Sequence, residues 1–296
     1  MKYLVSGATG FVGANLVRKL VQRSNDVSII ARESSDDWRL SGIKDDFTLC
    51  YCDLADRDSV FNLVGNYRPD IIFHIATYGG FSNQLNKDMM IGSNLIATMN
   101  LLDASVEYGA QQFINTGSSS EYGIKNEPMR EDDVCAPVSF YGLTKLAATN
   151  YCTMIGKTLH YPVCTLRLFS PYGEFEDLSR LYPSIKNALI NGNRPRLSQP
   201  DSVRDFISIE KVCEIYIKMT DAKYRPGDII NVGSGRQQTI QEFYSNIACS
   251  MGISLEPIWG NAPPRSFEPE RWEADINKLK SLITINLEQD DASCLQ

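Results

Sequence analysis

The chain has 296 residues, 43% of them hydrophobic, which is enough to bury a full core as one large domain or as two unequal lobes. Its formal net charge of -7 and its pI near 5.0 argue against nucleic acid or an anionic membrane surface as a partner. Eight scattered cysteines and two histidines form a poor set of zinc ligands, so we expect reduced structural thiols and no metal site.

The beginning of the chain runs directly into a strand-like pattern and lacks the layout of a signal peptide. No apolar run in the sequence reaches the length of a membrane span. We therefore expect a cytoplasmic protein.

A glycine-rich turn follows the first predicted strand, 3–6, and apolar residues at helical spacing follow the turn. Glycines at this spacing permit a tight turn, close approach of the backbone to a pyrophosphate, and close packing of helix on strand. The helix N-terminus adds N–H donors and the positive end of its dipole. The pattern predicts a dinucleotide site, with a glycine turn that binds nothing as the alternative. The residues expected to contact the dinucleotide here are Gly7, Thr9, Gly10, Phe11, Val12 and Gly13.

The end of the second predicted strand, 27–31, bears on which cofactor is bound. A carboxylate at this point would accept a hydrogen bond from the ribose 2'-hydroxyl of NAD, but the chain has Ala31 followed by Arg32. A guanidinium suits a 2'-phosphate. The sequence therefore favours NADP, with NAD as the alternative and a merely solvated Arg32 as the structural explanation.

Two further polar residues are expected near the cofactor. The strand 47–51 delivers Asp53, next to Leu54, to the carboxyl edge of the sheet, where its carboxylate could accept from an adenine amino group or cap the next helix. Asn94 lies on a predicted amphipathic helix, 92–108, and could hold backbone or water beside the cofactor. A purely structural hydrogen bond is the alternative for Asn94.

The segment 70–76 is a nearly continuous apolar strand, as expected where both faces of a parallel sheet are covered. It ends at Ile75 and Ala76, which we place beside the cofactor. His74, within the run, is expected in the core and not as a base.

A serine cluster and a Tyr–Lys pair form the candidate catalytic region. Strand 112–116 runs into Gly-Ser-Ser-Ser-Glu-Tyr-Gly, and doubly wound sheets bind ligands at such strand ends, although turn chemistry also favours serine. On a helix, Tyr141 and Lys145 would lie one turn apart. A nearby cation lowers the pKa of a phenol and lets it exchange protons with a substrate hydroxyl or carbonyl. An ordinary surface helix could also carry this pair, but the serines just before it favour a site.

Taken together, these motifs resemble those of the extended short-chain dehydrogenase/reductases, the family that modifies nucleotide-sugars. The matching motifs run in family order and are Gly7-Ala-Thr-Gly10-Phe-Val-Gly13, Asp53-Leu54, His74-Ile75-Ala76, Ser118 before Tyr122-Gly123, Tyr141-x-x-x-Lys145, Arg167-Leu-Phe-Ser-Pro-Tyr-Gly173 and Val203-Arg-Asp-Phe-Ile207.

The resemblance implies an α/β fold with a doubly wound parallel Rossmann sheet and a smaller mixed α/β C-terminal substrate lobe. The dinucleotide-binding domain is expected over 1–165, with a return segment near 205–232. The substrate lobe is expected over 166–204 and 233–296. A homodimer formed through two helices of each subunit is also implied.

The resemblance further implies Ser118, Tyr141 and Lys145 as the catalytic set. Tyr141 would act as acid/base, Lys145 would bind the nicotinamide ribose, and Ser118 would polarise the reacting oxygen. A nucleotide diphosphate sugar would be the substrate. Its expected contacts are Tyr78, Ser119, Ser120, Ser170 and the two diphosphate-binding arginines Arg204 and Arg265.

Departures from the family pattern narrow the reaction. The 4,6-dehydratases place a glutamate two residues before the Tyr-Gly, where this chain has Ser120, and Glu121 comes one residue later. Ser170 replaces the asparagine usual in 4-epimerases. With Arg32, these features favour NADPH-dependent reduction of the 4-keto group of a nucleotide-linked (deoxy)sugar. An NAD-dependent 4-epimerase is the alternative, ahead of a dehydratase or a non-catalytic NAD(P)-binding sensor.

Overall fold

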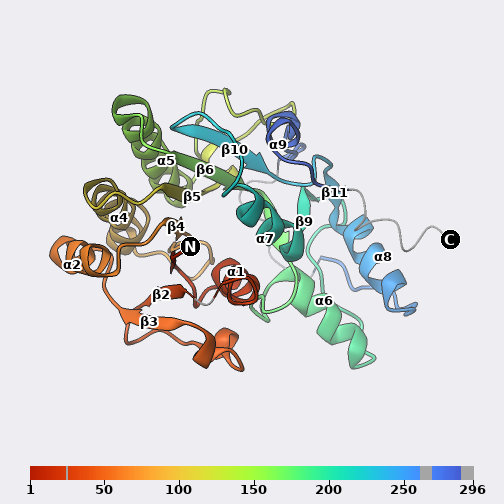
Figure 1. Cartoon of the computed structure of the whole chain (residues 1–296). Coiled ribbons are helices and arrows are strands. Elements are labelled where there is room, and N and C mark those ends of the chain that lie inside the picture. Colours follow the sequence, from red (N-terminus) through yellow and green to blue (C-terminus); the bar gives the residue numbers. More distant parts are fainter. Residues whose placement is uncertain (25, 261–268, 288–296) are drawn as a thin grey trace.

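The computed structural model describes residues 1–24, 26–260 and 269–287, and its centre is a seven-stranded parallel sheet (Figure 1). The strand order is β3-β2-β1-β4-β5-β6-β10. The strands are β1 (Tyr3–Ser6), β2 (Val27–Ala31), β3 (Thr48–Tyr51), β4 (Ile71–His74), β5 (Gln112–Ser118), β6 (Val163–Leu168) and β10 (Asp228–Val232). This is the predicted doubly wound sheet, and β10 supplies its last strand from late in the chain.

Helices cover both faces of the sheet, which explains why its inner strands read as unbroken apolar runs. One face carries α1 (Phe11–Val21) and α7 (Ile209–Lys218), and the other carries α2 (Arg57–Tyr67), α4 (Ala97–Glu107) and α5 (Phe140–Leu159). Successive side chains of a strand point to opposite faces. Leu4 and Ile72 accordingly pack into the core under α2 and α4, while Val5 and Phe73 pack into the core under α1 and α7.

Several predicted boundaries differ from the observed ones. The predicted strand 70–76 is shorter in the structure, where β4 covers Ile71–His74, and the Ile75 N–H still donates to the Ser6 carbonyl at 3.2 Å. The predicted helix 92–108 is preceded by a short α3 (Lys87–Met90) and begins as a π-helix, η3 (Ile91–Ile96), before α4. The widened turn places Asn94 inside the protein.

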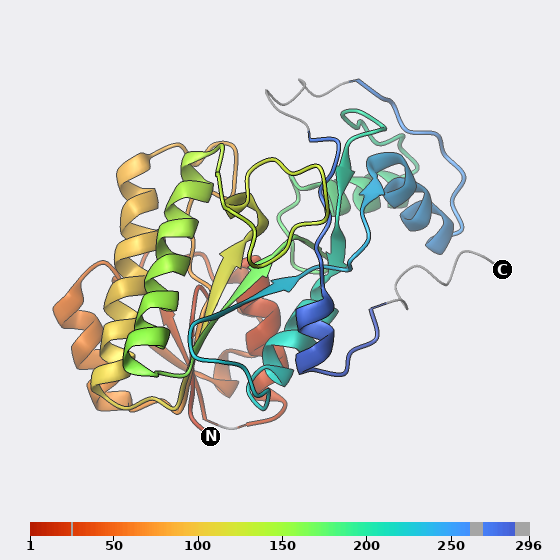
Figure 2. The ribbon, with the colours of Figure 1, turned by 90° about the horizontal axis from the view of Figure 1, so that it is seen from above.

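The C-terminal half supplies a smaller lobe with a core of its own (Figure 2). In it β7 (Ser170–Tyr172) pairs parallel with β9 (Phe206–Ser208), and β8 (Val203–Arg204) pairs antiparallel with β11 (Gln238–Thr239). Two helices, α6 (Leu181–Ile190) and α8 (Ile240–Ser250), pack around an aromatic cluster in which the rings of Phe206 and Phe243 stack at 3.8 Å. A last helix, α9 (Asn277–Leu282), returns to β10. None of the described helices combines the length and the apolarity needed to span a membrane.

Candidate active site

The glycine turn lies where the carboxyl ends of β1 and β4 meet, the point at which doubly wound sheets bind ligands. Gly7 has a φ of +70°, and a Cβ on it would lie 2.5 Å from the Ala76 nitrogen. A Cβ on Gly13 would lie 2.2 Å from the Gly7 carbonyl oxygen. Gly10 is the N-cap of α1 and leaves that helix end without a side-chain cap. The turn therefore leaves the backbone N–H groups at the start of α1 without a side-chain cap, beside a space that a side chain at Gly7 or Gly13 would occupy.

Arg32 is exposed, in a turn where its N–H donates to the Ser35 hydroxyl at 3.1 Å. A different arginine approaches the glycine turn. Arg39 lies in the short helix η1 (Trp38–Leu40), and its guanidinium donates to the carbonyls of Thr9 at 3.3 Å and Phe175 at 2.7 Å. No sequence pattern identified Arg39, because η1 is a single short turn with no periodicity.

Asp53 is exposed, and its Oδ1 accepts from the Ala55 N–H at 2.9 Å. The capping role considered for Asp53 belongs to Asp56, which accepts from the N–H groups of Asp58 and Ser59 at the start of α2.

His74 is a core residue. Its ring nitrogens lie 2.7 Å from the Ser6 hydroxyl and 2.9 Å from the Thr98 hydroxyl. Burial, with a smaller contribution from the charge of Lys145, lowers the pKa of His74 to about 3, so the ring is neutral at physiological pH.

Asn94 holds the segment that follows β4. It is fully buried, accepts from the Tyr78 N–H at 2.8 Å and donates to the Tyr78 carbonyl at 2.8 Å. Its amide also donates to the Thr144 hydroxyl at 2.9 Å, which ties this segment to α5. Asn94 thus fixes backbone beside the site, one of the two roles considered for it.

The start of α5 brings Tyr141 to the serine loop. Ser139 caps the helix by accepting from the Gly142 N–H at 3.0 Å. A Cβ on Gly142 would lie only 2.4 Å from the Ser120 carbonyl oxygen, so a glycine is required for this close approach. The hydroxyls of Tyr141 and Ser118 are therefore held within hydrogen-bonding reach, and Lys145 is buried one turn along the helix.

Burial dominates the ionisation of this group. It raises the pKa of Tyr141, although hydrogen bonds from Thr77 and Ser118 lower it. The sequence predicted a lowered pKa, and that prediction is wrong for the free chain because desolvation of the phenolate outweighs the favourable contacts. Burial likewise lowers the pKa of Lys145.

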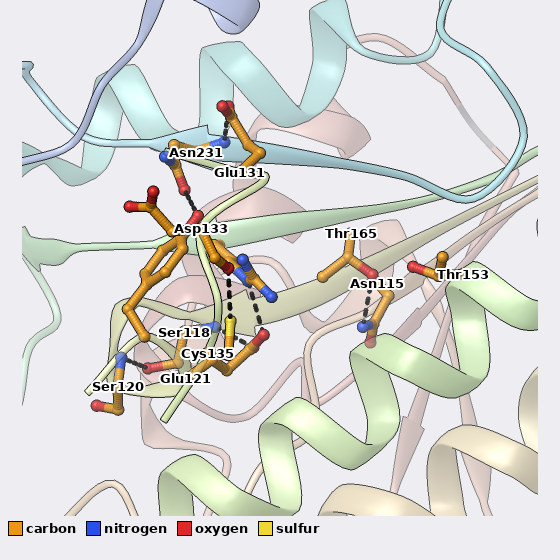
Figure 3. A network of polar contacts seen from close by, with 12 residues as sticks. Asn115, Ser118, Ser120, Glu121, Glu131, Asp133, Cys135, Thr153, Thr165 and Asn231 are labelled. Atoms are coloured by element: carbon orange, nitrogen blue, oxygen red, sulfur yellow. Dashed lines mark hydrogen bonds and ion pairs between the residues drawn. The ribbon is translucent and has the colours of Figure 1, made fainter. Parts of the chain in front are cut away.

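The serine loop is the short helix η4 (Ser119–Glu121), which begins directly after β5. The Ser118 hydroxyl accepts from the Ser120 N–H at 3.2 Å, and the Ser118 N–H donates to Glu121 Oε1 at 2.8 Å (Figure 3). Ser119 is buried and Ser120 is half-buried. Glu121 is fully buried and its carboxylate pairs with Arg167.

The substrate contacts expected from the smaller lobe are only partly assembled. Ser170 is half-buried, and its N–H donates to the Asp205 carbonyl at 3.0 Å. The Arg204 guanidinium lies 5.8 Å from the centre of the Trp272 ring. Arg265 lies outside the described residues.

A cation and an acid that sequence reasoning missed lie at the junction of the lobes. Arg180, at the N-cap of α6, donates to the Gly80 carbonyl at 2.9 Å and lowers the pKa of Tyr141. Burial raises the pKa of Glu176 to about 7, and Arg180 opposes that shift. Both residues follow β7 in a loop without periodicity, which is why no sequence pattern identified them.

Comparisons with known proteins identify the family of this chain. A profile of the "NAD dependent epimerase/dehydratase family" matches residues 3–233. A putative UDP-glucose 4-epimerase of Methanocaldococcus jannaschii is 25% identical over 287 residues, which cover 94% of this chain and 91% of that protein.

Solved structures share the fold over nearly the whole chain. A UDP-N-acetylglucosamine 4-epimerase from Methanobrevibacter ruminantium superposes with a TM-score of 0.87 at 22% identity, covering 98% of this chain and 94% of its own. A UDP-glucuronic acid 4-epimerase from Bacillus cereus, solved with UDP-glucuronic acid and NAD, superposes with a TM-score of 0.82 at 26% identity, covering 97% and 95%. The chain therefore belongs to the NAD dependent epimerase/dehydratase family, within the extended short-chain dehydrogenase/reductase enzymes.

Proposed function

We propose that the chain is an NAD-dependent nucleotide-sugar 4-epimerase in which Tyr141 accepts and donates the proton. The observation that carries the proposal is the meeting of the Ser118 and Tyr141 hydroxyls at the end of the sheet, one helical turn from the buried Lys145. The 4-epimerases among the similar proteins support it.

The residues at the end of β1 fit a dinucleotide. Gly7 and Gly13 leave space that any Cβ would fill, and the uncapped N-terminus of α1 suits a pyrophosphate. We propose that the predicted contacts Thr9, Phe11 and Val12 complete this cradle. A bound nicotinamide cofactor supplies reversible hydride transfer to a carbon of the substrate.

Oxidation of a sugar C4 alcohol to a ketone releases one hydride and one proton. Tyr141 takes the proton from the C4 oxygen and returns it when the carbon is reduced on the opposite face. Ser118 hydrogen-bonds the same oxygen, and Lys145, one turn along the helix, would bind the nicotinamide ribose. The sugar is proposed to lie against Tyr78, Ser119, Ser120 and Ser170, with Arg204 toward its diphosphate.

The buried position of Glu121 disfavours dehydration. A dehydratase needs a base in the serine loop that can reach the sugar C5, and the Glu121 carboxylate is committed to Arg167 and to the Ser118 N–H. Ser120, the residue at the family's glutamate position, cannot serve as such a base at neutral pH.

A second candidate is the NADPH-dependent 4-keto reductase expected from the sequence. It is favoured by the exposed Arg32 at the end of β2, where a carboxylate specific for NAD is missing. Ser170, in place of the asparagine usual in 4-epimerases, points the same way.

One set of assays separates the two candidates. The cofactor released from the purified protein is identified, and UDP-glucose, UDP-N-acetylglucosamine and UDP-glucuronic acid are each incubated without added cofactor. Released NAD and formation of a C4 epimer are expected. Oxidation of NADPH by a nucleotide-linked 4-keto-6-deoxysugar, without epimer formation, would establish the reductase instead. Tyr141→Phe should lower turnover about 10²–10⁴-fold while the protein remains folded.

The predicted homodimer is also part of the proposal. Exposed apolar residues on α5, including Leu143 and Met154, share a helix face, and Met89 and Ile91 lie on the adjacent α3 and η3. Light scattering of the wild type and of Met154→Glu tests this interface. A monomeric wild type would exclude it.

A further inference from the structure

A buried ion pair lies beside the serine loop (Figure 3). The Arg167 Nε lies 2.7 Å from Glu121 Oε2, and the two side chains are 2% and 0% exposed. Arg167 comes from β6, where it is the register partner of Gly117 on β5. The other carboxylate oxygen accepts from the Ser118 N–H at 2.8 Å. One carboxylate therefore joins the guanidinium to the backbone of the predicted catalytic serine.

Neighbouring residues pack closely against this ion pair. A Cβ on Gly117 would lie 2.8 Å from Glu121 Oε1 and 3.0 Å from Arg167 Cγ. The guanidinium stacks 4.4 Å from the centre of the Tyr122 ring, and the Tyr122 hydroxyl donates to Asn231 Oδ1 at 2.6 Å. The pair is thus fixed from β5 on one side and from β10 on the other.

Stability does not explain the pair. Burying two charges costs free energy, and apolar residues of similar volume often serve a fold as well or better. The Arg167 Nη1 atom is also buried without a hydrogen-bond partner. This unfavourable ion pair lies beside the serine loop, and its position there indicates that it serves the site.

We propose that Glu121 and Arg167 are positioning residues: Glu121 fixes the backbone of Ser118 and places a negative charge near Tyr141 and Lys145, and Arg167 holds Glu121 in place. The proposal rests on the roles given above to Ser118 and Tyr141.

The charges near Tyr141 and Lys145 predict the direction in which the pKa of each should shift. Glu121 raises the pKa of Tyr141 and that of Lys145, because an anion disfavours the phenolate and favours the ammonium. The other groups acting on Tyr141 are Arg180, from the N-cap of α6, and the hydroxyls of Thr77 and Ser118. The groups near Lys145 are His74 of β4 and Cys152 of α5, both uncharged at neutral pH.

Glu121→Gln keeps the size of the side chain and a carbonyl for the Ser118 N–H but removes the charge. The pKa of Tyr141, followed by NMR of protein labelled at the tyrosine Cζ and assigned with Tyr141→Phe, should be lower than in the wild type. If Glu121→Gln does not fold, the double variant Glu121→Gln, Arg167→Met removes both charges and should give the same direction. A folded variant with an unchanged Tyr141 pKa would overturn the proposal.

A matched control and an activity measurement complete the test. Asp103→Asn removes a carboxylate from another ion pair, 2.8 Å from Arg57, and should leave the Tyr141 pKa unchanged. In the epimerase assay the acid limb of the pH–rate profile should move to lower pH in Glu121→Gln, which lost packing alone would not cause. The NMR titration needs no substrate. Its result therefore stands even if no epimerase activity is found.

Discussion

The carboxyl group of Glu176 should make the stability of the protein depend on pH. It lies in the loop after β7. Two hydrogen bonds hold this loop against the domain of the seven-stranded sheet: the Glu174 carbonyl accepts from Asn15 at 3.0 Å, and the Phe175 carbonyl accepts from Arg39 at 2.7 Å. Glu176 Oε2 is buried without a hydrogen-bond partner. A carboxylate in this position is poorly solvated, so the structure favours the protonated form.

The size of the effect follows from the pKa. Burial raises the pKa of Glu176 from 4.5 to about 7, and this corresponds to about 3 kcal/mol as an upper bound. Above the unfolded pKa the unfolded chain loses this proton more readily than the folded one. The stability contributed by the group is therefore complete below pH 4.5 and is lost as the pH rises through about 7. Glu176→Gln should be more stable than wild type at pH 8 and nearly equal to it at pH 4.5.

Urea unfolding at these two pH values measures the difference. Glu174→Gln is the matched control, since Glu174 is an exposed neighbour whose ion pair with Lys186 lies on the surface. Such pairs contribute about 0–1 kcal/mol, so the control should differ little from wild type at either pH. If the difference between Glu176→Gln and wild type is the same at both pH values, Glu176 is not a buried carboxyl with a raised pKa.

Two further predictions concern the core and the close approach at α5. Because burial lowers the pKa of His74 from 6.5 to about 3, the wild type should lose about 1.4 kcal/mol per pH unit below 6.5, and His74→Gln should flatten this dependence in urea titrations. An equally steep dependence in the variant would contradict the assignment. Gly142→Ala should cost about 1–3 kcal/mol and reduce turnover, because its Cβ would meet the Ser120 carbonyl at 2.4 Å. Gly92→Ala, whose Cβ meets nothing within 4 Å, should be neutral or stabilising in thermal unfolding, and equal losses in both variants would refute the packing argument.

Local patterns allowed the sheet, the glycine turn and the Tyr141–Lys145 pair to be predicted from the sequence. In each case the residues that define the feature are neighbours in the chain and share one strand, turn or helix face. Arg39 and Arg180 could not be predicted in this way, because their partners Thr9 and Gly80 are brought to them by the fold. A sequence shows that an arginine is present, but it does not show which carbonyl the guanidinium reaches.

The sequence predicted the wrong direction for the Tyr141 pKa shift, for a related reason. The spacing to Lys145 indicated a favourable charge, whereas the observed direction depends on burial, which only the packed structure determines. Glu121 illustrates the same limit. Its one-residue displacement from the dehydratase position was visible in the sequence, but its partner Arg167 comes from the neighbouring strand, 46 residues further along the chain.

The contacts between the lobes include a residue that acts on the pKa of Tyr141. Asn15 and Arg39, in the domain of the seven-stranded sheet, donate to carbonyls of the loop after β7. Arg180, at the end of that loop, donates to the Gly80 carbonyl of the larger domain. All three acceptors are backbone carbonyls. Arg180 also lowers the pKa of Tyr141, while Glu121 raises it from η4, the short helix directly after β5. Burial therefore sets the direction of the Tyr141 pKa shift, and the opposing charges of Glu121, in η4, and Arg180, at the start of α6, adjust its size.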